Sequence, residues 1–453
     1  MMRRRTVVRS AAAGALLSVC VGLLAIAFSG GATATDSAAA STDAQAPGGA
    51  ASFDPSRLAR GEYLAKAADC AGCHTAPRGG APYAGGLGMG SPFGTIVSSN
   101  ITPDPQYGIG RYTYEEFGRA LREGVARGGK RLYPAMPYVS FSKLSDEDVH
   151  ALYEYMLHGV APIAKPTPRS DVAFPFNQRW ALRFWQMVFV PSQPYVPRPQ
   201  SDAKWNRGAY LVQGAGHCGA CHTPRGMFYQ ESGLDESSSD YLVGGVNDHW
   251  FAPNLTGDMG SGLGRLTAAD IAAFLKTGHG AGVVAYGSMV EQVEDSSQYL
   301  TDEDLHAIAH YLKSLPAQRP SGTYTGGADP ARSSVNGNRV ADSLSVGFNV
   351  YQSFCASCHH ADGRGVPNAF PALAGNPSVI AEDTTSLIRL LIEGGNSPTT
   401  QSGPPRQSMP AFATTLADVE IAQVLTYIRG AWGNNAQPVT ANDVATLRSE
   451  LHK

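Results

Sequence analysis

The sequence lacks the features on which several classes of function depend. It has no Gly-rich dinucleotide fingerprint, no nucleophile elbow and no repeating propeller motif for a quinone cofactor. Only 16% of its positions are charged and its formal net charge is −3, so it lacks the basic surface that nucleic acid binding requires. No apolar run of membrane-spanning length follows the N-terminal segment. We therefore expect no nucleic acid partner and no catalytic centre of these kinds.

Glycine and proline, in contrast, are abundant. The chain has 51 glycines and 30 prolines among its 453 residues, more than average usage. A chain of this length is sufficient for two to four domains with cores of their own. The composition indicates many loops and little long regular structure, which suits small domains built around a cofactor.

The first 34 residues have the pattern of a signal peptide. A cluster of arginines precedes an apolar run at 11–28, and Ala32-Thr33-Ala34 resembles a cleavage site with small residues. Removing this segment eliminates four arginines and no acidic residue, so the formal charge changes from −3 to −7. An uncleaved anchor is the alternative, because the apolar run is close to the roughly 18 residues at which a span becomes possible. The match of Arg4-Arg5 to a twin-arginine signal is poor.

Six of the seven cysteines form three Cys-x-x-Cys-His segments, here called hooks 1, 2 and 3. The seventh, Cys20, lies inside the predicted signal peptide. Two thiols three residues apart on one helical turn can form thioethers to the two vinyl groups of one porphyrin, and the next histidine then faces its iron. The sequence therefore predicts three covalently bound haem c groups. The hooks are Cys70-Ala-Gly-Cys73-His74, Cys218-Gly-Ala-Cys221-His222 and Cys355-Ala-Ser-Cys358-His359.

Two other uses of a Cys-x-x-Cys pair fit the sequence less well. A thioredoxin-like redox pair would require a neighbouring strand-helix-strand pattern, which is not found. A structural zinc site would join two such pairs into one tetrahedral shell. Three separate hooks, each followed by histidine, favour haem.

The hooks lie in repeated surroundings. Gly61-Glu-Tyr63-Leu64 precedes hook 1, Gly208-Ala-Tyr210-Leu211 precedes hook 2, and Gly347-Phe-Asn-Val-Tyr351 is a looser version. After hooks 1 and 2, an Asn-x-Thr pair, a short amphipathic helix stopped by glycine, and a closing helix recur in the same order. The closing helices are expected near 144–152, 300–308 and 416–428, and the third unit lacks the Asn-x-Thr loop.

The predicted fold is mainly α, with three tandem cytochrome c-like helical domains, each wrapped around one covalent haem. The linkers follow from stretches rich in proline, glycine and serine. The expected boundaries are 1–34 for the signal peptide, 35–54 for a flexible lead-in, 55–161 for domain 1, 162–199 for a linker, 200–316 for domain 2, 317–339 for a second linker, 340–434 for domain 3, and 435–453 for a peripheral tail.

A sixth ligand is needed on the side of each iron opposite the histidine, and methionine commonly supplies it. Met409 is the only methionine after hook 3, and Met136 occupies the corresponding place before the closing helix of domain 1. Met289 has this place in domain 2, but without the following proline. The competing methionines are Met89 and Met156 in domain 1 and Met227 and Met259 in domain 2, and the histidines that could ligate instead include His158, His249, His279 and His310.

Two further features carry weaker predictions. Arg111 and Arg265 occupy matching positions in the repeat and could hydrogen-bond haem propionates, with plain surface charge as the alternative. The linker segment 174–190 is dense in aromatic residues. An amphipathic helix there could lie in the lipid interface or dock on a partner protein, or it could pack between domains 1 and 2.

The order of these features resembles the cytochrome subunit of the membrane-bound bacterial alcohol, gluconate, sorbitol and fructose dehydrogenases. The resemblance covers about residues 58–432. It implies an electron carrier, not an enzyme on its own, at the periplasmic side of the inner membrane. Its partners would be a flavin or quinoprotein dehydrogenase subunit, the membrane surface and ubiquinone. Other possibilities are a stand-alone haem enzyme of peroxidase or thiosulfate-oxidising type, which needs an open iron site, and a soluble electron shuttle.

Overall fold

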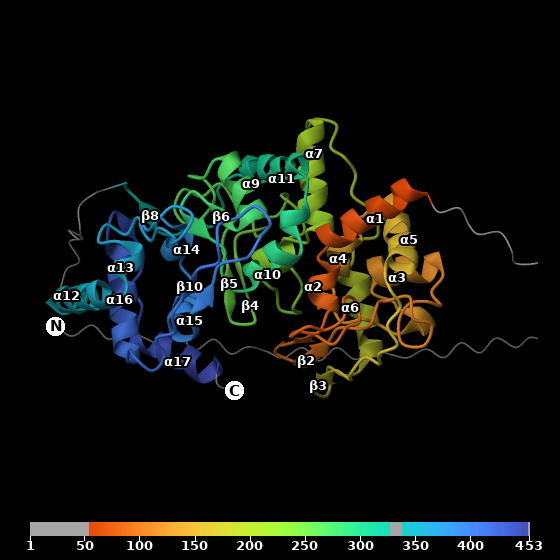
Figure 1. Cartoon of the computed structure of the whole chain (residues 1–453), viewed down its shortest axis with the longest axis horizontal. Helices are drawn as coiled ribbons and strands as arrows, with labels where there is room; N and C mark the ends of the chain where they lie inside the picture. Colours follow the sequence, from red (N-terminus) through yellow and green to blue (C-terminus); the bar gives the residue numbers. More distant parts are fainter. Residues whose placement is uncertain (1–53, 327–337, 452–453) are drawn as a thin grey trace, which may run out of the picture. The chain divides into compact units, whose positions relative to one another are not determined.

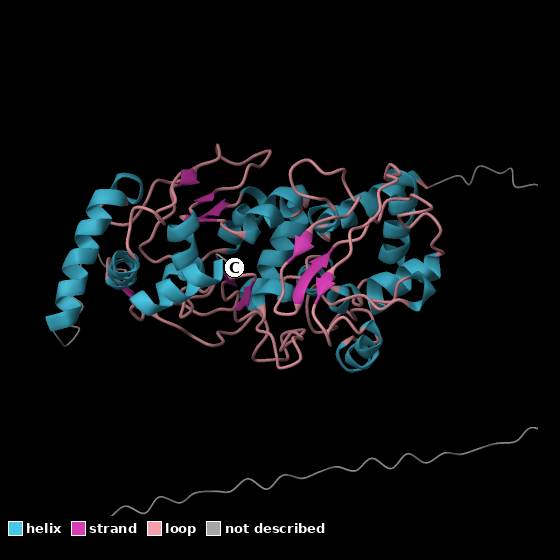
Figure 2. Cartoon of the chain, turned by 90° about the horizontal axis from the view of Figure 1, so that it is seen from below, coloured by secondary structure: helices cyan, strands magenta, loops and turns pink. Residues whose placement is uncertain are grey.

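The structure, a computed structural model, describes residues 54–326 and 338–451. The predicted signal peptide, nearly all of the lead-in and part of the second linker lie outside these residues. Helices predominate and the strands are short, which confirms the mainly α architecture (Figure 2). Within the described ranges, no helix is both long enough and apolar enough to cross a bilayer.

Domain 1 and the linker that follows it run from orange to yellow in Figure 1. Strands β1, β2 and β3 form an antiparallel sheet in which Gly88 lies opposite Val97 and Gly94 opposite Val172. The first linker therefore contributes a strand to domain 1. The elements are α1 (Pro55–Ala67), α2 (Cys70–His74), β1 (Gly88–Met89), β2 (Gly94–Val97), α3 (Tyr114–Glu123), a 3-10 turn (Arg127–Gly129), α4 (Tyr138–Phe141), α5 (Asp146–Glu154), a π-helical turn (Tyr155–Gly159), β3 (Asp171–Val172), a second 3-10 turn (Arg179–Ala181) and α6 (Leu182–Phe189).

Domain 2, mostly green in Figure 1, repeats this order of helices. Its two small antiparallel sheets pair β4 with β5 and β6 with β7. The elements are α7 (Ala203–Tyr210), a π-helical turn (Leu211–Ala215), α8 (Gly219–His222), β4 (Gly245–Asn247), β5 (Trp250–Ala252), α9 (Ala268–Thr277), β6 (His279–Gly280), β7 (Val283–Val284), α10 (Ser288–Asp295), a 3-10 turn (Ser297–Tyr299), α11 (Asp302–Ser314) and β8 (Thr323–Tyr324).

Domain 3 is blue in Figure 1 and includes a C-terminal helix. The expectation of a peripheral tail is wrong, because α17 packs on α16 and buries Val444 and Leu447 in the domain core. The apolar residues of this helix are spaced by three and four, a pattern that should have indicated a packed face. The elements are α12 (Asn338–Phe354), α13 (Ala356–His359), α14 (Pro377–Ile380), α15 (Thr385–Glu393), β9 (Gly395–Asn396), β10 (Ser408–Met409), α16 (Asp418–Gly430), β11 (Asn434–Asn435) and α17 (Ala441–Leu451).

The helix boundaries follow from local capping residues. Thr113 and Thr267 each make a capping box with the acid three residues later, Glu116 or Asp270, and so begin α3 and α9. Both helices end at a glycine in the left-handed conformation, Gly124 and Gly278. The predicted amphipathic helices with a glycine stop are confirmed. Ser145 and Thr301 accept the capping hydrogen bonds that begin the closing helices α5 and α11.

The first helix of each domain crosses its closing helix at a glycine. α1 packs on α5, α7 on α11 and α12 on α16. A Cβ atom on Gly61 would lie 2.1 Å from the carbonyl oxygen of Ala151, and a Cβ atom on Gly208 would lie 2.0 Å from that of Ala307. Only glycine permits helix backbones to approach so closely. The glycines of the repeat therefore mark the points at which the first and the closing helix of each domain are in closest contact.

The apolar core is divided unequally among the three domains. One continuous cluster contains buried side chains of both domain 1 and domain 2, including Leu64 and Leu152 from the first and Leu211 and Leu312 from the second. Domain 3 has a separate cluster around α12, α15, α16 and α17. Domains 1 and 2 thus share one hydrophobic interior.

Candidate functional site

Each hook occupies a single helical turn. Hook 1 forms α2, while hooks 2 and 3 form α8 and α13 with their first cysteine at the helix start. The amide nitrogens of His222 and His359 donate to the carbonyl oxygens of Cys218 and Cys355, both at 2.9 Å. All six hook cysteines are outside disulfides. The two thiols and the imidazole of each hook are therefore arranged along one turn, as thioether attachment of a haem requires.

The thiols lack the property of a redox pair. Burial raises the pKa of Cys70 and of Cys218 to about 12. A catalytic Cys-x-x-Cys centre depends on a lowered thiol pKa, which gives a thiolate near neutral pH. Burial of Cys70 and Cys218 acts in the opposite direction and favours the protonated thiol.

The three hook histidines are oriented in the same way. Nδ1 of His74 lies 2.7 Å from the carbonyl oxygen of Ser99, and Nδ1 of His222 lies 2.7 Å from that of Pro253. Nδ1 of His359 lies 2.9 Å from the carbonyl oxygen of a third residue, Pro371. A carbonyl only accepts, so Nδ1 carries the proton and Nε2 has the lone pair that a metal ion needs. The arrangement fits haem c, for which a covalent hook and an oriented imidazole are the protein's contribution.

Desolvation supports this protonation state. Burial lowers the pKa of His74, His222 and His359 below the ordinary value of 6.5. The imidazoles are therefore neutral near pH 7, and a neutral imidazole is the form that binds a metal.

The Asn-x-Thr pairs hold the carbonyls that orient two of these histidines. Asn100 follows Ser99, and its Nδ2 donates to the carbonyl oxygens of Ile163 and Lys165 at 2.8 and 3.0 Å. Thr102 accepts a hydrogen bond from the amide of Ile163 at 3.1 Å. The loop that contacts His74 is thus tied to the segment after the closing helix.

Domain 2 repeats this arrangement. Asn254 follows Pro253, and its Nδ2 donates to the carbonyl oxygen of Gln318 at 2.9 Å. The amide of Gln318 donates to Oγ1 of Thr256 at 3.1 Å. The sequence showed the repeated pair but gave no sign of its partner, which lies more than 60 residues later.

Domain 3 supports its histidine differently. Nδ2 of Asn376 donates to the carbonyl oxygen of Ala372 at 2.9 Å, and Nδ2 of Asn434 donates to that of Leu373 at 3.0 Å. Two asparagines from different segments therefore hold the loop after Pro371. Asn434 was predicted only as the end of the domain.

The three predicted methionine ligands are half-buried. Met136 lies just before α4 and packs on the core with Cys70, and Met409 forms part of β10 and packs on the core with Cys355. Met289 is the second residue of α10, after Gly287, whose positive φ of 56° brings the chain against Trp250. Coordination by these methionines remains a prediction.

The competing residues occupy varied environments. Met156 is 2% exposed in the core, whereas Met227 and Met259 are 93% and 61% exposed. His279 is buried, with Nδ1 3.1 Å from the carbonyl oxygen of Thr277 and no hydrogen-bond partner for Nε2 among the described residues. The other rivals occupy different environments: Met89 pairs with Ile96 in β1, His158 belongs to a π-helical turn, and His249 and His310 are near Glu450 and Asp202.

The two repeat arginines differ in their surroundings. Arg111 is exposed, whereas the guanidinium of Arg265 donates to the carbonyl oxygens of Met259, Gly260 and Gly375. Arg265 also lies 4.8 Å from the ring centre of Tyr324. It therefore links domain 2 to domain 3. A contact of either arginine with a haem propionate remains a prediction.

The aromatic linker segment has two different sides. Gln186 is buried and donates to the carbonyl oxygen of Gly124 at 2.9 Å, and Nε1 of Trp185 donates to that of Phe228 at 2.9 Å. The other side is open: Trp180 is 68% exposed, and Phe174, Phe184, Met187 and Val188 are at least half exposed. The segment thus packs against both domains 1 and 2 and leaves an apolar surface uncovered.

Comparison with known proteins agrees with this geometry. A family profile described as Cytochrome c matches residues 58–159, 206–316 and 345–432. The chain is 48% identical to the cytochrome c subunit of alcohol dehydrogenase (quinone) from Gluconacetobacter polyoxogenes, over 87% of this chain and 85% of that protein. It is 46% identical to the gluconate 2-dehydrogenase cytochrome c subunit of Pantoea cypripedii, over 86% and 89%. It is 38% identical to the fructose dehydrogenase cytochrome subunit of Gluconobacter japonicus, over 86% and 82%.

Proposed function

Because the chain belongs to the cytochrome c family, whose members transport electrons by covalently bound haem, we propose that it is the three-haem electron-transfer subunit of a dehydrogenase complex. The observation that carries the proposal is the threefold repetition of a hook whose histidine donates Nδ1–H to a backbone carbonyl. One site of this kind would suffice for a shuttle. Three in one chain suit a relay between two fixed ends.

Each haem would be held by one hook. Haem c supplies a one-electron redox centre, and the chain supplies attachment, orientation and a dry surrounding. The proposed iron ligands are His74 with Met136, His222 with Met289, and His359 with Met409. The carbonyl contacts at Nδ1 fix the ring orientation and raise the basicity of Nε2.

The donor is proposed from the names of the relatives. The proteins from Gluconacetobacter polyoxogenes, Pantoea cypripedii and Gluconobacter japonicus are named as subunits of alcohol, gluconate and fructose dehydrogenases. A flavin or quinoprotein subunit would oxidise the substrate and pass single electrons to this chain. The pattern of residues 1–34 supports export, which would place the complex on the periplasmic side of the inner membrane.

The acceptor is proposed to be ubiquinone, reached at the membrane surface. The exposed side chains around α6, including Phe174, Trp180 and Phe184, give an apolar surface of the kind that lies in a lipid interface. The guanidinium of Arg179 lies 4.1 Å from the ring centre of Tyr133 and so belongs to the packed side of this segment. The apolar side would therefore meet lipid while the packed side stays fixed to the protein.

Purification of the tagged chain from detergent-solubilised membranes tests the proposal. Alcohols, aldehydes and sugar acids are added one at a time while the reduced-haem absorption band is followed. We expect one substrate class to reduce the haems and a larger subunit to co-purify. Mass measurement should find three haems in the wild type and two in the C70A/C73A variant. A soluble periplasmic protein that no substrate reduces would contradict the assignment.

A further inference from the structure

Domains 1 and 2 are joined by a reciprocal pair of hydrogen bonds, in which a tyrosine of each domain donates to an aspartate of the other. Tyr63 of α1 donates to Oδ2 of Asp304 in α11 at 2.5 Å, and Tyr210 of α7 donates to Oδ2 of Asp148 in α5. Tyr63 and Tyr210 occupy the same position of the repeat, as do Asp148 and Asp304. Each domain thus gives the other a donor and receives the equivalent donor in return, which is the pattern of a two-fold symmetric interface.

Each tyrosine oxygen also accepts a hydrogen bond from the start of the partner's closing helix. The amide of Thr301 donates to the hydroxyl of Tyr63 at 3.3 Å, and the amide of Ser145 donates to that of Tyr210 at 3.1 Å. Backbone amides at a helix start have no partner within the helix. The two tyrosines therefore fix the N-terminal starts of both closing helices.

The carboxyl groups that accept the tyrosine hydrogen bonds are buried and lie next to arginines. Asp148 is 1% exposed and Asp304 is 6% exposed. Each pairs with an arginine of its own domain, Asp148 with Arg60 at 2.5 Å and Asp304 with Arg207 at 2.6 Å. Buried carboxylates need full hydrogen bonding, so the position of each tyrosine is strictly defined.

The segments next to hooks 1 and 2 lie in the same interface. Helix α10 packs on α2, which is hook 1. The hydroxyl of Ser296 donates to the carbonyl oxygen of Ala67 at 3.4 Å, and the ring of Phe141 meets that of His217, beside Cys218, with 5.8 Å between ring centres. The two hooks are thus positioned by the contacts that join the domains.

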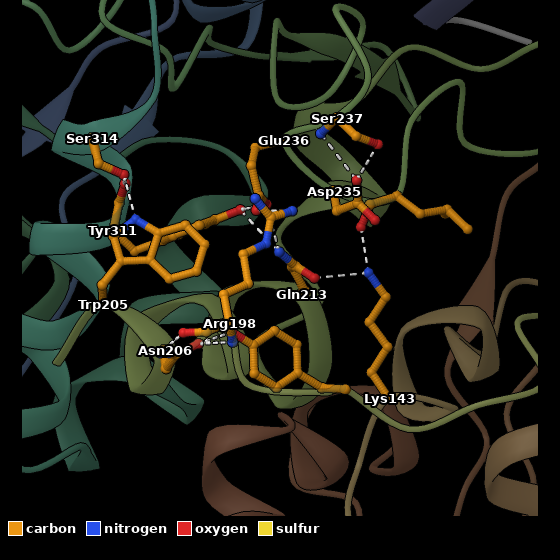
Figure 3. A network of polar contacts seen from close by, with 12 residues as sticks. Lys143, Arg198, Trp205, Asn206, Gln213, Asp235, Glu236, Ser237, Tyr311 and Ser314 are labelled. Atoms are coloured by element: carbon orange, nitrogen blue, oxygen red, sulfur yellow. Dashed lines mark hydrogen bonds and ion pairs between the residues drawn. The ribbon is translucent and has the colours of Figure 1, made fainter. Parts of the chain in front are cut away.

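A polar network adds a further contact between domains 1 and 2 (Figure 3). The buried ammonium of Lys143, from domain 1, donates to Oε1 of Gln213 in domain 2 at 2.9 Å. Gln213 in turn donates to Oε2 of Glu236 at 2.8 Å, which also accepts from the hydroxyl of Tyr311 at 2.7 Å. Arg198 of the linker pairs with Oε1 of Glu236 at 2.5 Å. This network secures the linker to both domains.

We infer that domains 1 and 2 form one rigid two-haem module, in which Tyr63 and Tyr210 are positioning residues that fix hook 1 relative to hook 2. The inference rests on the proposed function only for the presence of haem at those hooks. With haem bound at both hooks, the module would hold the two redox centres at a constant separation, so electron transfer between them would need no domain movement. Domain 3 has a separate core and contacts domain 2 through polar groups, such as the guanidinium of Arg265 and the carbonyl oxygen of Gly375.

The test compares the full-length Y63F/Y210F variant with a matched control, Y153F, whose hydroxyl contacts the carbonyl oxygen of Tyr112 within domain 1. Hydrogen exchange followed by mass spectrometry reports on the segments that contain Ser145 and Thr301. We expect exchange to accelerate about fivefold in both segments of the double variant, the effect of one lost hydrogen bond each. The control should leave both segments unchanged.

Circular dichroism in the main haem absorption band reports on the second consequence. Two haems held close together give a paired positive and negative signal, which should weaken in Y63F/Y210F and persist in Y153F. Unchanged exchange and an unchanged paired signal at full haem content would overturn the inference. Haem missing from hook 1 or 2 of the wild type would refute the proposed function, while the exchange measurement would still decide whether the tyrosines join the domains.

Discussion

The side-chain amide of Asn100 donates to the carbonyl oxygen of Ile163 at 2.8 Å and so connects the loop that orients His74 to the chain beyond the closing helix. Asn254 makes the equivalent contact with Gln318 in domain 2. An orienting carbonyl is useful only if its own position is fixed. These asparagines supply that support through hydrogen bonds to a segment more than 60 residues later in the chain.

Replacing Asn100 with alanine should therefore destabilise domain 1. The carbonyl oxygens of Ile163 and Lys165 would lose their donor, at a cost of about 1–3 kcal/mol in the free energy of unfolding. Denaturant unfolding of N100A measures this cost. N349A, at an exposed position of α12, is the control and should change stability by less than about 0.5 kcal/mol. Equal stability of the two variants would contradict the supporting role.

A methyl group on Gly61 should prevent α1 from packing on α5. Its Cβ atom would lie 2.1 Å from the carbonyl oxygen of Ala151, so the helices must separate, at a cost of about 1–3 kcal/mol. In G118A the new Cβ atom meets only Val149 at 3.8 Å, and the better helix propensity of alanine should add up to about 1 kcal/mol. Thermal unfolding should show a lower melting temperature for G61A and a higher one for G118A than for the wild type. Similar melting temperatures would mean that the crossing tolerates a side chain.

The hydrogen bond from Tyr63 to Asp304 predicts that the free energy of unfolding depends on pH. Burial alone would raise the pKa of Asp304, but hydrogen bonds from Arg207 and Tyr63 outweigh it and place the pKa below the ordinary value of 3.8. Because the folded state has the lower pKa, Asp304 contributes stability above about pH 3.8 that is lost as the pH falls through the lowered value. The difference in unfolding free energy between wild type and D304N should shrink in this acid range.

The control for this measurement is D302N, two residues earlier in the same helix. The Asp302 side chain is 84% exposed and lies 3.6 Å from Lys276. Exposed pairs contribute little, so this substitution should change stability by less than about 1 kcal/mol at any pH. A constant difference between wild type and D304N across the acid range would contradict the assigned role of Asp304.

Exchange of a methionine ligand should change one haem and spare the others. Methionine raises the reduction potential relative to a second histidine, so M409H should lower one of three potentials in a spectroelectrochemical titration. M227H is the control, because Met227 is 93% exposed on another domain. An unaltered titration of M409H with full haem content would exclude Met409 as a ligand.

The exposed apolar side of α6 predicts weaker membrane attachment for W180S/F184S. Both side chains are more than half exposed, so their loss should reduce the protein's affinity for vesicles without unfolding it. Co-sedimentation with vesicles of inner-membrane lipid measures the change. V196S removes an exposed apolar side chain outside this helix and is the control. Equal sedimentation of all three proteins would leave α6 without a membrane role.

Local features of the fold could be predicted because their signals are short-range. The hooks and the glycine stops at Gly124 and Gly278 depend on neighbours within a few residues. The mainly α architecture followed from their repetition. The packed helix α17 was missed although Val444 and Leu447 gave the spacing for a buried face.

Long-range contacts could not be predicted in the same way. The partner of Asn100 is 63 residues away, and Tyr63 is separated from Asp304 by 241. Nothing in the pattern around Tyr63 distinguishes a hydroxyl that contacts its own domain from one that contacts the next. Such pairings depend on how whole domains assemble, which a repeat indicates only by its existence.

The reciprocal contacts of Tyr63 with Asp304 and of Tyr210 with Asp148 also bear on the direction of electron flow. Two identical chains joined by such an interface would be equivalent, and any substitution would alter both halves together. Here the halves are encoded separately, and one pair of equivalent contacts already differs in chemistry: Lys143 donates to Gln213, whereas at the matching positions Lys66 lies 5.1 Å from the ring centre of Tyr299. One redox centre can therefore become easier to reduce than its neighbour. Because the two halves belong to one chain, substitutions in one half could make the reduction potentials of the two centres differ, and electron transfer in one direction would then be favoured.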